Sequence, residues 1–258
     1  MPLHGRTVVV TGAGGGLGRG IAEAVAEAGA NVVVGDLALD PVAETARRIE
    51  TGGGRALPLV LDVTLPDSIA AAIARATRTL GRLDGWVNNA GILRMDAALD
   101  VAPADWEAQM RVNVSGLFSC CQIVARQLIA QGDGGAIVNV ASNAGKVGYP
   151  NMAGYNAGKA AVINLTRSLA AEWAAHGINV NAVCPGGVET PMLTAVAEWI
   201  TSRHGGDAQE LVQRMVPAQL GRHVQPIEVG RVVAFLLSDA AAIIRGQSIN
   251  VDGGDTPY

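Results

Sequence analysis

Tyr155 and Lys159 are the residues whose side chains and spacing most directly suggest chemistry. They stand four residues apart in Tyr155-Asn156-Ala157-Gly158-Lys159, which opens a run with helical period, so they share one face of a predicted helix. A free tyrosine has a pKa of about 10, but an ammonium about 5 Å away favours the phenolate by about 3 kcal/mol at an effective dielectric constant of about 20. Such a pair could exchange a proton with a ligand. For the pair in isolation, an exposed tyrosine and lysine on a solvated helix is the simpler alternative.

A glycine-rich loop is the second candidate site. It reads Thr11-Gly12-Ala13-Gly14-Gly15-Gly16-Leu17-Gly18 and lies between a predicted strand and a predicted helix over residues 19–28. Positions without a side chain let the backbone approach a phosphate, whose charge would face the positive end of the helix. A flexible turn is the alternative, but the place between strand and helix favours nucleotide binding. The predicted contacts are Gly12, Gly14, Gly15, Gly16, Leu17 and Gly18.

Asp36 is the residue that predicts which dinucleotide binds. It ends the second predicted strand, where a carboxylate would reach the two hydroxyls of an adenosine ribose. Asp36 could instead cap the next helix, but Asp40, followed by Pro41, fills that role as a predicted N-cap. A carboxylate would repel a 2′-phosphate, and the glycine loop holds no basic residue, so we expect NAD rather than NADP. Leu37 is predicted to line the same end of the site.

Further along the chain, Asp62 and Val63 end the third predicted strand and could contact adenine. An ordinary polar strand end is the alternative. The next predicted helix starts with Thr64 as its N-cap and Asp67 in its first turn.

The elements that must position these residues alternate along the chain. Short β-branched runs occur at residues 7–11, 31–35, 56–61, 85–88, 136–141, 179–183 and 248–251, and all but the last precede longer segments with helical period. This alternation predicts parallel strands joined by right-handed helical crossovers. We expect one domain over residues 1–258, with a mainly dinucleotide-binding half (1–100) and a catalytic half (101–258). Residues 190–220 interrupt the pattern and are predicted to form a helical lid, called the lid below.

Composition limits the partners that this chain can have. Apolar residues make up 49% and charged residues 16% of 258 residues, the net charge is −4, and basic residues are scattered. We therefore expect a small-molecule partner, and neither nucleic acid nor an anionic lipid surface. Three cysteines without paired spacing indicate no metal site and a reduced, cytoplasmic setting. No signal-like segment and no apolar stretch near about 18 residues is visible, so no membrane span is expected.

Taken together, these motifs resemble the short-chain dehydrogenase/reductase family from about Arg6 to about Gly254. Ala141 and Gly158 depart from it, since many relatives have serine there. The resemblance implies a Rossmann-type, doubly wound, seven-stranded parallel sheet with helices on both faces, and a homotetramer. The matching pieces are the glycine loop, Asn88-Asn89-Ala90-Gly91, Asn113, Ser142, Tyr155 with Lys159, and Pro185-Gly186.

The resemblance also implies roles for the four candidate catalytic residues. Tyr155 would exchange the hydroxyl or carbonyl proton, while Lys159 lowers its pKa and binds the nicotinamide ribose. Ser142 would hydrogen-bond the substrate oxygen. Asn113 would hold a water that continues the proton relay, with a helix-packing amide as the alternative.

Two further segments are implied to contact the cofactor. Asn89, Ala90 and Gly91 would border the adenosine ribose, although turn chemistry competes as an explanation of Asn89. Beyond the sixth strand, the segment that contains Pro185, Gly186, Val188 and Thr190 would contact the nicotinamide. Thr190 could also cap the lid helix, because Pro191 follows it; the two roles can coexist.

The predicted activity is NAD-dependent interconversion of a secondary alcohol and its ketone. Ser142, Asn143, Tyr149, Asn151, Trp199 and Arg94 could line a polar pocket, which favours a small diol, polyol or sugar over a steroid. A surface position for most of them is the alternative. The lid also looks similar to that of polyol and vicinal-diol dehydrogenases of this family.

Two other functions are compatible with the same motifs. A 3-oxoacyl-thioester or 3-hydroxyacyl reductase fits the same family, with Asp36 and the negative net charge arguing mildly against it. A non-catalytic NAD-binding sensor or scaffold would have no physical need for the intact set of Asn113, Ser142, Tyr155 and Lys159.

Overall fold

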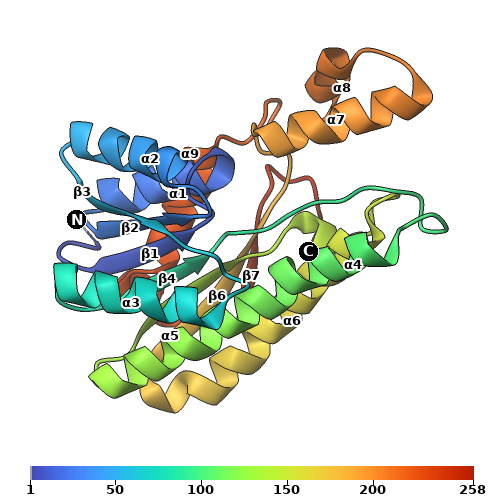
Figure 1. Ribbon diagram of the computed structural model, residues 1–258. Coiled ribbons are helices and arrows are strands. Elements are labelled where there is room, and N and C mark those ends of the chain that lie inside the picture. The colour runs from blue at the N-terminus through green and yellow to red at the C-terminus, as the bar shows by residue number, and fades with distance from the viewer. Residues whose placement is uncertain (1) are drawn as a thin grey trace.

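The centre of the protein is a parallel sheet of seven strands in the order β3-β2-β1-β4-β5-β6-β7 (Figure 1). A computed structural model describes residues 2–258. The order reverses between β1 and β4, as in a doubly wound Rossmann-type fold, so the predicted fold class is confirmed. The strands are β1 (Thr7–Thr11), β2 (Asn31–Asp36), β3 (Arg55–Val60), β4 (Gly85–Asn88), β5 (Gly135–Val140), β6 (Ile178–Pro185) and β7 (Ser248–Val251).

Burial on both faces explains the composition of the central strands. β1 reads Thr-Val-Val-Val-Thr and is buried throughout, and its Val8, Val9 and Val10 lie opposite Val32, Val33 and Val34 of β2. A parallel strand covered on both faces carries continuous apolar runs rather than an alternating pattern. Three of the predicted strand ranges match the structure, and the other four differ by one or two residues at one or both ends.

Helices cover both faces of the sheet (Figure 1). One layer contains α1 (Gly16–Glu27), α2 (Leu39–Thr51) and α9 (Pro226–Leu236), and the other contains α3 (Pro66–Leu80), α5 (Leu117–Gln131) and α6 (Ala153–Trp173). Side chains of successive strand residues point to opposite faces. Accordingly Val8 and Val10 pack into the first core with Ile21, whereas Val9 packs into the second core with Trp86.

Two of the predicted helix starts are wrong. α2 begins at Leu39 with Ala38 as its N-cap, so Asp40 lies inside the first turn and caps nothing with its side chain. Pro41 is tolerated there because the first backbone N–H groups of a helix have no intrahelical partner. α3 begins at Pro66 after Leu65. Thr64 is not its cap because the Thr64 N–H and hydroxyl both donate to Asp62 Oδ1, at 2.8 and 2.7 Å.

A long helical run crosses beneath the sheet. It consists of α4 (Pro103–Met110), a π-helical turn η1 (Arg111–Gly116) and α5. By length and hydropathy alone this run could cross a membrane. In the structure, however, Leu117, Cys120, Val124 and Leu128 of α5 pack into the core with Trp86, which explains the apolar composition of the run.

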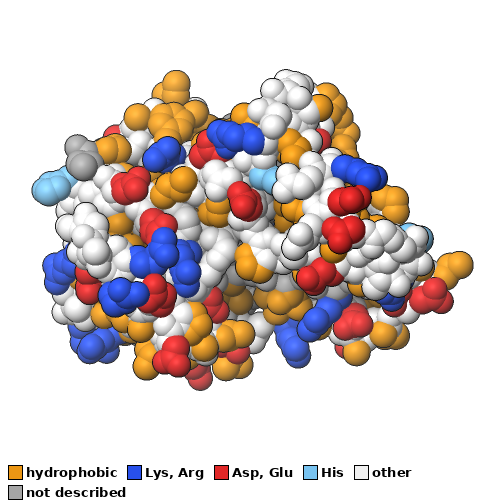
Figure 2. All heavy atoms as spheres, turned by 90° about the horizontal axis from the view of Figure 1, so that it is seen from above, with side chains coloured by type: hydrophobic (Ala, Val, Ile, Leu, Met, Phe, Trp, Pro, Cys, Tyr) orange, Lys and Arg blue, Asp and Glu red, His pale blue; other side chains and the backbone are white. Residues whose placement is uncertain are grey.

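The lid forms two helices, α7 (Pro191–His204) and α8 (Ala208–Arg214), which lie above the rest of the molecule in Figure 1. Gly205 and Gly206 join them with φ values of 76° and 103°, a region that favours glycine. The prediction that Thr190 is the N-cap residue of α7, with Pro191 as its first residue, is confirmed. On the face seen from above, basic and acidic side chains are interspersed (Figure 2).

Short 3-10 turns complete the chain at η2 (Asn143–Gly145), η3 (Ala174–His176) and η4 (Asp239–Ala241).

A buried polar network joins β4 and β5 below the site. Asn139 accepts a hydrogen bond from Asn88 Nδ2 at 2.8 Å and donates to Thr166 Oγ1 at 2.9 Å. Asn88 in turn accepts from Trp86 Nε1 at 2.7 Å and donates to Cys121 Sγ at 3.2 Å. Since buried polar groups must be paired, this network fixes the two strands next to each other.

Replacing Asn139 with alanine should therefore lower the free energy of unfolding by about 2–3 kcal/mol, because it leaves buried partners without hydrogen bonds. Urea unfolding measures this change. Asn164→Ala removes an exposed asparagine of α6 and serves as the control, with an expected change within about 0.5 kcal/mol. An equal effect of the two substitutions would contradict the structural role of the network.

Candidate active site

A cavity of about 940 Å³ opens at the carboxyl ends of the strands. Ligands of doubly wound sheets bind at this edge, near the point where the strand order reverses. Most of the predicted site residues line the cavity. They are Gly12, Gly15, Gly16, Leu17, Gly18, Asp36, Leu37, Asp62, Val63, Asn89, Ala90, Gly91, Ser142, Asn143, Tyr149, Tyr155, Lys159, Pro185, Gly186, Val188 and Thr190.

The glycine loop presents bare backbone to this cavity. α1 starts at Gly16, three residues earlier than predicted, and its N-cap Gly15 offers no side chain to the free N–H groups of the first turn. A Cβ atom on Gly15 would meet no atom within 4 Å, so the loop faces open space there. The N-terminus of a helix with free N–H groups is suited to bind a phosphate.

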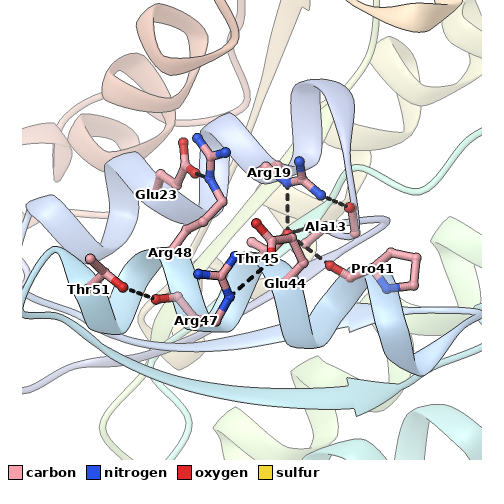
Figure 3. A network of polar contacts seen from close by, with 10 residues as sticks. Ala13, Arg19, Glu23, Pro41, Glu44, Thr45, Arg47, Arg48 and Thr51 are labelled. Atoms are coloured by element: carbon pink, nitrogen blue, oxygen red, sulfur yellow. Dashed lines mark hydrogen bonds and ion pairs between the residues drawn. The ribbon is translucent and has the colours of Figure 1, made fainter.

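Gly14 has a different role from the one predicted, because it does not line the cavity. Its N–H donates to Asp36 Oδ2 at 2.9 Å, and its carbonyl accepts from Arg19 Nη2 at 2.6 Å. A Cβ atom at this position would lie 2.7 Å from Pro41 Cβ, so only glycine fits. Arg19 also donates to Thr45, whose hydroxyl donates to the Ala13 carbonyl (Figure 3). These hydrogen bonds of Arg19 and Thr45 fix the backbone of the glycine loop through residues that do not line the cavity.

Asp36 ends β2 with its carboxylate directed to the loop. Its two oxygens accept from the N–H groups of Gly14 and Leu37, at 2.9 and 2.7 Å. The next residue, Leu37, is apolar and 67% exposed, so it offers no positive charge beside the carboxylate. The carboxylate is oriented by the backbone and keeps acceptor capacity for hydroxyl donors, because each oxygen has more than one lone pair.

Asn89 ties the loop after β4 to the end of β1. Its Nδ2 donates to the carbonyls of Thr11 and Gly12, at 2.9 and 3.0 Å, and its N–H donates to Thr11 Oγ1 at 3.0 Å. A Cβ atom on Gly18 would lie 2.5 Å from this same Nδ2. Asn89 thus holds the loop geometry while it borders the cavity.

The segment after β6 closes the opposite side. Gly186 packs so tightly that an added Cβ atom would lie 2.6 Å from Asp252 Cβ. Val188 forms an isolated bridge with Val224, and its carbonyl accepts from the Thr190 hydroxyl at 3.3 Å. Although Thr190 is the N-cap residue, its side chain makes no capping hydrogen bond and lines the cavity instead.

Ser142, Tyr155 and Lys159 meet at one end of the cavity. Ser142 follows β5, and the other two lie in the first two turns of α6. The Lys159 Nζ lies 5.5 Å from the centroid of the Tyr155 ring, and it donates to the Val140 carbonyl at 2.8 Å. The prediction that the tyrosine and the lysine share a helix face is confirmed. Both Ser142 and Lys159 are buried.

The electrostatics of this pair differ from the expectation. Burial raises the pKa of Tyr155 above its usual value, and a hydrogen bond with Ser142 only partly offsets this rise. Burial also lowers the pKa of Lys159 to about 8. The predicted lowering of the Tyr155 pKa by Lys159 is not seen in the free protein, where burial has the larger effect.

Asn113 lies in the π-helical turn η1 and does not line the cavity in the described part of the chain. Its Oδ1 accepts from the Ile92 N–H and its Nδ2 donates to the Ile92 carbonyl, both at 2.8 Å. The amide thus fixes the segment after Gly91. Each of the two side-chain groups makes one hydrogen bond to Ile92, which supports the alternative of a packing amide.

Of the predicted substrate residues, Asn143 and Tyr149 line the cavity beside Ser142. Asn143 Nδ2 donates to the Tyr149 hydroxyl at 2.9 Å and to Asp255 Oδ2 at 3.0 Å. Asp255 was not predicted as a site residue. It follows β7, the neighbour of β6, and its position just past a parallel strand is the sequence feature that could have indicated it.

Asn151, Trp199 and Arg94, the other residues predicted to contact a substrate, are not among the residues that line this cavity within residues 2–258. Trp199 packs instead against Arg203, whose guanidinium carbon lies 4.0 Å from the indole ring centroid. Arg94 is exposed next to Asp105. Asn151 takes a turn conformation with φ of 63°.

Comparison with known proteins identifies the class of this site. A family model described as "Enoyl-(Acyl carrier protein) reductase" matches residues 12–256. The chain is 37% identical to 3-oxoacyl-(acyl-carrier-protein) reductase FabG of Thermotoga maritima, over 98% of this chain and 99% of that protein. It is 41% identical to cis-4-hydroxycyclohexanecarboxylate dehydrogenase of Sinomonas cyclohexanicum, over 97% and 96%.

A crystal structure agrees with these matches. A short-chain type dehydrogenase/reductase from Mycobacterium marinum superposes with a TM-score of 0.90 at 35% identity, covering 99% of this chain and 97% of that one. Fold, site and relatives define an oxidoreductase that acts on CH–OH groups with a nicotinamide cofactor. The chain belongs to the short-chain dehydrogenase/reductase family.

Proposed function

We propose that this protein is an NAD-dependent dehydrogenase that interconverts a secondary alcohol and its ketone, with a neutral diol, polyol or sugar as the favoured substrate. The observation that carries the cofactor choice is Asp36, whose backbone-oriented carboxylate lines the cavity beside the exposed Leu37. A carboxylate accepts hydrogen bonds from two ribose hydroxyls and repels a phosphate in the same place.

The cavity has the features that a dinucleotide needs. The open space before Gly15 admits a diphosphate, and Asp36 stands at the ribose end. Asp62, Val63, Asn89, Ala90 and Gly91 would border the adenosine. At the other end, Pro185, Gly186, Val188 and Thr190 would contact the nicotinamide, which accepts or returns a hydride when it is bound.

The residues of the chain supply orientation and proton transfer. The Ser142 hydroxyl orients the substrate oxygen, and Tyr155 removes its proton during oxidation or returns it during reduction. Lys159 lies 5.5 Å from the Tyr155 ring centroid and binds the nicotinamide ribose. Because Tyr155 and Lys159 lie in one buried site, the loss of a proton is assigned to the pair and not to either residue alone. A water held by Asn113 would carry the relay beyond Lys159.

The substrate class follows from the polar groups beside Ser142. Asn143 and Tyr149 line the cavity next to the proposed reacting centre and are hydrogen-bonded to each other at 2.9 Å. A substrate with several hydroxyl groups replaces the hydrogen bonds that such groups make with water, whereas a purely apolar substrate does not.

A 3-oxoacyl-thioester reductase is the second candidate. The lid turns apolar side chains into the cavity, namely Met192, Leu193, Val196, Met215 and Val216, which would suit an acyl chain. The relative from Thermotoga maritima has a name of this kind. A basic docking face for an acidic carrier would support this candidate, but the face in Figure 2 carries both charges interspersed.

We further propose that residues 1–258 form one domain, that residues 190–220 close over the substrate, and that the protein is a homotetramer in the cytoplasm. The three cysteines are buried and unpaired among the described residues, which supports a reduced setting. The tetramer rests on the family resemblance.

Tyr155→Phe should lower kcat by at least about 1,000-fold, since it removes the proton-transferring hydroxyl. Absorbance of the reduced cofactor would be followed with a panel of diols, polyols, simple secondary alcohols and 3-hydroxyacyl thioesters. Affinity for NADH should stay within about threefold. Tyr258→Phe removes the hydroxyl of an exposed tyrosine and is the control. Retained turnover in Tyr155→Phe would refute the proposed catalytic role of Tyr155. If the wild type binds NADH but turns over no member of the panel, a sensor function would be favoured.

Alcohol oxidation should rise with pH between about 7 and 9. The Lys159 pKa is lowered to about 8, so the pair releases its first proton in this range, and oxidation needs a deprotonated pair. Ketone reduction, which needs the proton, should fall over the same range. The measurement is kcat/KM against pH for the wild type and for Lys159→Arg, whose guanidinium stays charged. Identical profiles in the two proteins would show that Lys159 does not set the transition.

The wild type should prefer NAD over NADP by at least about 100-fold in kcat/KM, because the Asp36 carboxylate opposes a 2′-phosphate. Asp36→Ala combined with Leu37→Arg should reverse this preference. Asp40→Asn removes an exposed carboxylate that does not line the cavity, and it should leave the ratio unchanged. Equal use of both cofactors by the wild type would overturn the role of Asp36.

A further inference from the structure

Asp255 is a carboxylate in the cavity that the proposed reaction does not use. It lies in the C-terminal tail after β7 and lines the cavity together with Ser142 and Tyr155. Neither hydride transfer nor proton transfer requires a carboxylate beside Ser142 and Tyr155. Its presence therefore needs another explanation.

The tail holds Asp255 in a defined place. The Asp252 carboxylate is buried and accepts hydrogen bonds from the Gly254 N–H at 3.1 Å and from the Thr256 N–H at 2.9 Å. The Thr256 hydroxyl donates to the same carboxylate at 2.5 Å. From the lid side, Gln219 Nε2 donates to the Gly254 carbonyl at 2.8 Å. The turn that carries Asp255 is thus fixed at both ends.

A chain of hydrogen bonds links Asp255 to the proposed reacting centre. The Ser142 hydroxyl donates to Asn143 Oδ1 at 3.3 Å, and Asn143 Nδ2 donates to Asp255 Oδ2 at 3.0 Å. One asparagine side chain therefore spans the gap between the serine and the carboxylate. A small substrate with two hydroxyl groups could bridge the same two residues, with one hydrogen bond at each end.

One oxygen of Asp255 remains available as an acceptor. The Tyr149 hydroxyl, at 3.4 Å, and Asn143 both contact Oδ2, and no hydrogen bond within residues 2–258 reaches Oδ1. Burial, followed by the charge of Asp255, raises the pKa of Tyr149 to about 12, so the phenol stays protonated. The donors of Asn143 and Tyr149 are already directed at Asp255 or at each other, so the cluster offers an incoming ligand the free Oδ1 acceptor.

Within residues 2–258, Asp255 forms no ion pair with a lysine, arginine or histidine. Arg214 also lines the cavity, but its side chain is 75% exposed and pairs with Glu210. A hydroxyl group that enters this end would gain a charge-assisted hydrogen bond, whereas a carboxylate would be repelled.

We propose that Asp255 is a specificity-determining residue that accepts a hydrogen bond from a second hydroxyl, on the carbon next to the one that is oxidised, and that it excludes substrates with a carboxylate there. The substrate class is then a neutral vicinal diol and its hydroxyketone. This inference rests on the proposed function and names its substrate more closely.

Three substrates that share a four-carbon chain separate hydroxyl recognition from charge. Butane-2,3-diol carries the second hydroxyl, butan-2-ol lacks it, and 3-hydroxybutyrate carries a carboxylate instead. The measurement is kcat/KM with NAD for the wild type, Asp255→Ala and Asp255→Asn. Asp100→Asn, which neutralises an exposed carboxylate outside the cavity, is the matched control. NADH affinity, measured by fluorescence titration, reports whether each variant keeps its fold.

Asp255→Ala should reduce the preference for the diol over butan-2-ol by about 10- to 100-fold, the usual value of a hydrogen bond to a charged group. Asp255→Asn should raise the relative rate on 3-hydroxybutyrate by about 10-fold, and the control should change neither ratio. An unchanged diol preference, or an equal loss on the diol and on butan-2-ol, would overturn the role of Asp255 while the proposed dehydrogenase function stands. Wild-type turnover of 3-oxoacyl thioesters and of neither alcohol would instead overturn the proposed function, and the inference with it.

Discussion

The buried ammonium of Lys159 is the constraint on which the rest of the site depends. Only 4% of this residue is exposed, and a cation inside a protein is costly unless it is hydrogen-bonded. The Val140 carbonyl, at the carboxyl end of β5, supplies that bond at 2.8 Å. For this contact α6 must cross closely over η2, where a Cβ atom on Gly145 would lie 2.6 Å from the Lys159 backbone. The position of α6 relative to the end of β5 is therefore tied to the hydrogen bond of the buried Lys159 ammonium.

The same constraint brings the neighbouring segments together. A Cβ atom on Gly91 would lie 3.1 Å from Asn113 Oδ1 and 3.7 Å from Lys159 Nζ, so the loop after β4 passes close to both side chains. Asn113 then fixes Ile92, the next residue of that loop. Below this layer, the bonds of Asn139 hold β4 and β5 in place. Precision at the proposed site thus comes from buried packing and not from surface contacts.

Much of this arrangement could be predicted from the sequence, because parallel strands end at one edge of the sheet. That rule alone places Asp36, Asn89 and Ser142 around one cavity, although they are far apart in the chain. The helix starts were less predictable. Thr64 has the residue type of an N-cap, but its N–H and hydroxyl donate to Asp62 instead. The side of α7 that carries Trp199 depends on how the lid packs, and Asp255 depends on a turn held by Asp252, for which no periodic pattern exists.

A crystal structure of the protein with NADH and a vicinal diol would test this account most directly. The account predicts that both adenosine ribose hydroxyls lie about 3 Å from the Asp36 carboxylate, and that the hydroxyl to be oxidised lies within about 3 Å of both Ser142 and Tyr155. A ribose turned away from Asp36, or a diol bound with neither hydroxyl near Tyr155, would contradict it.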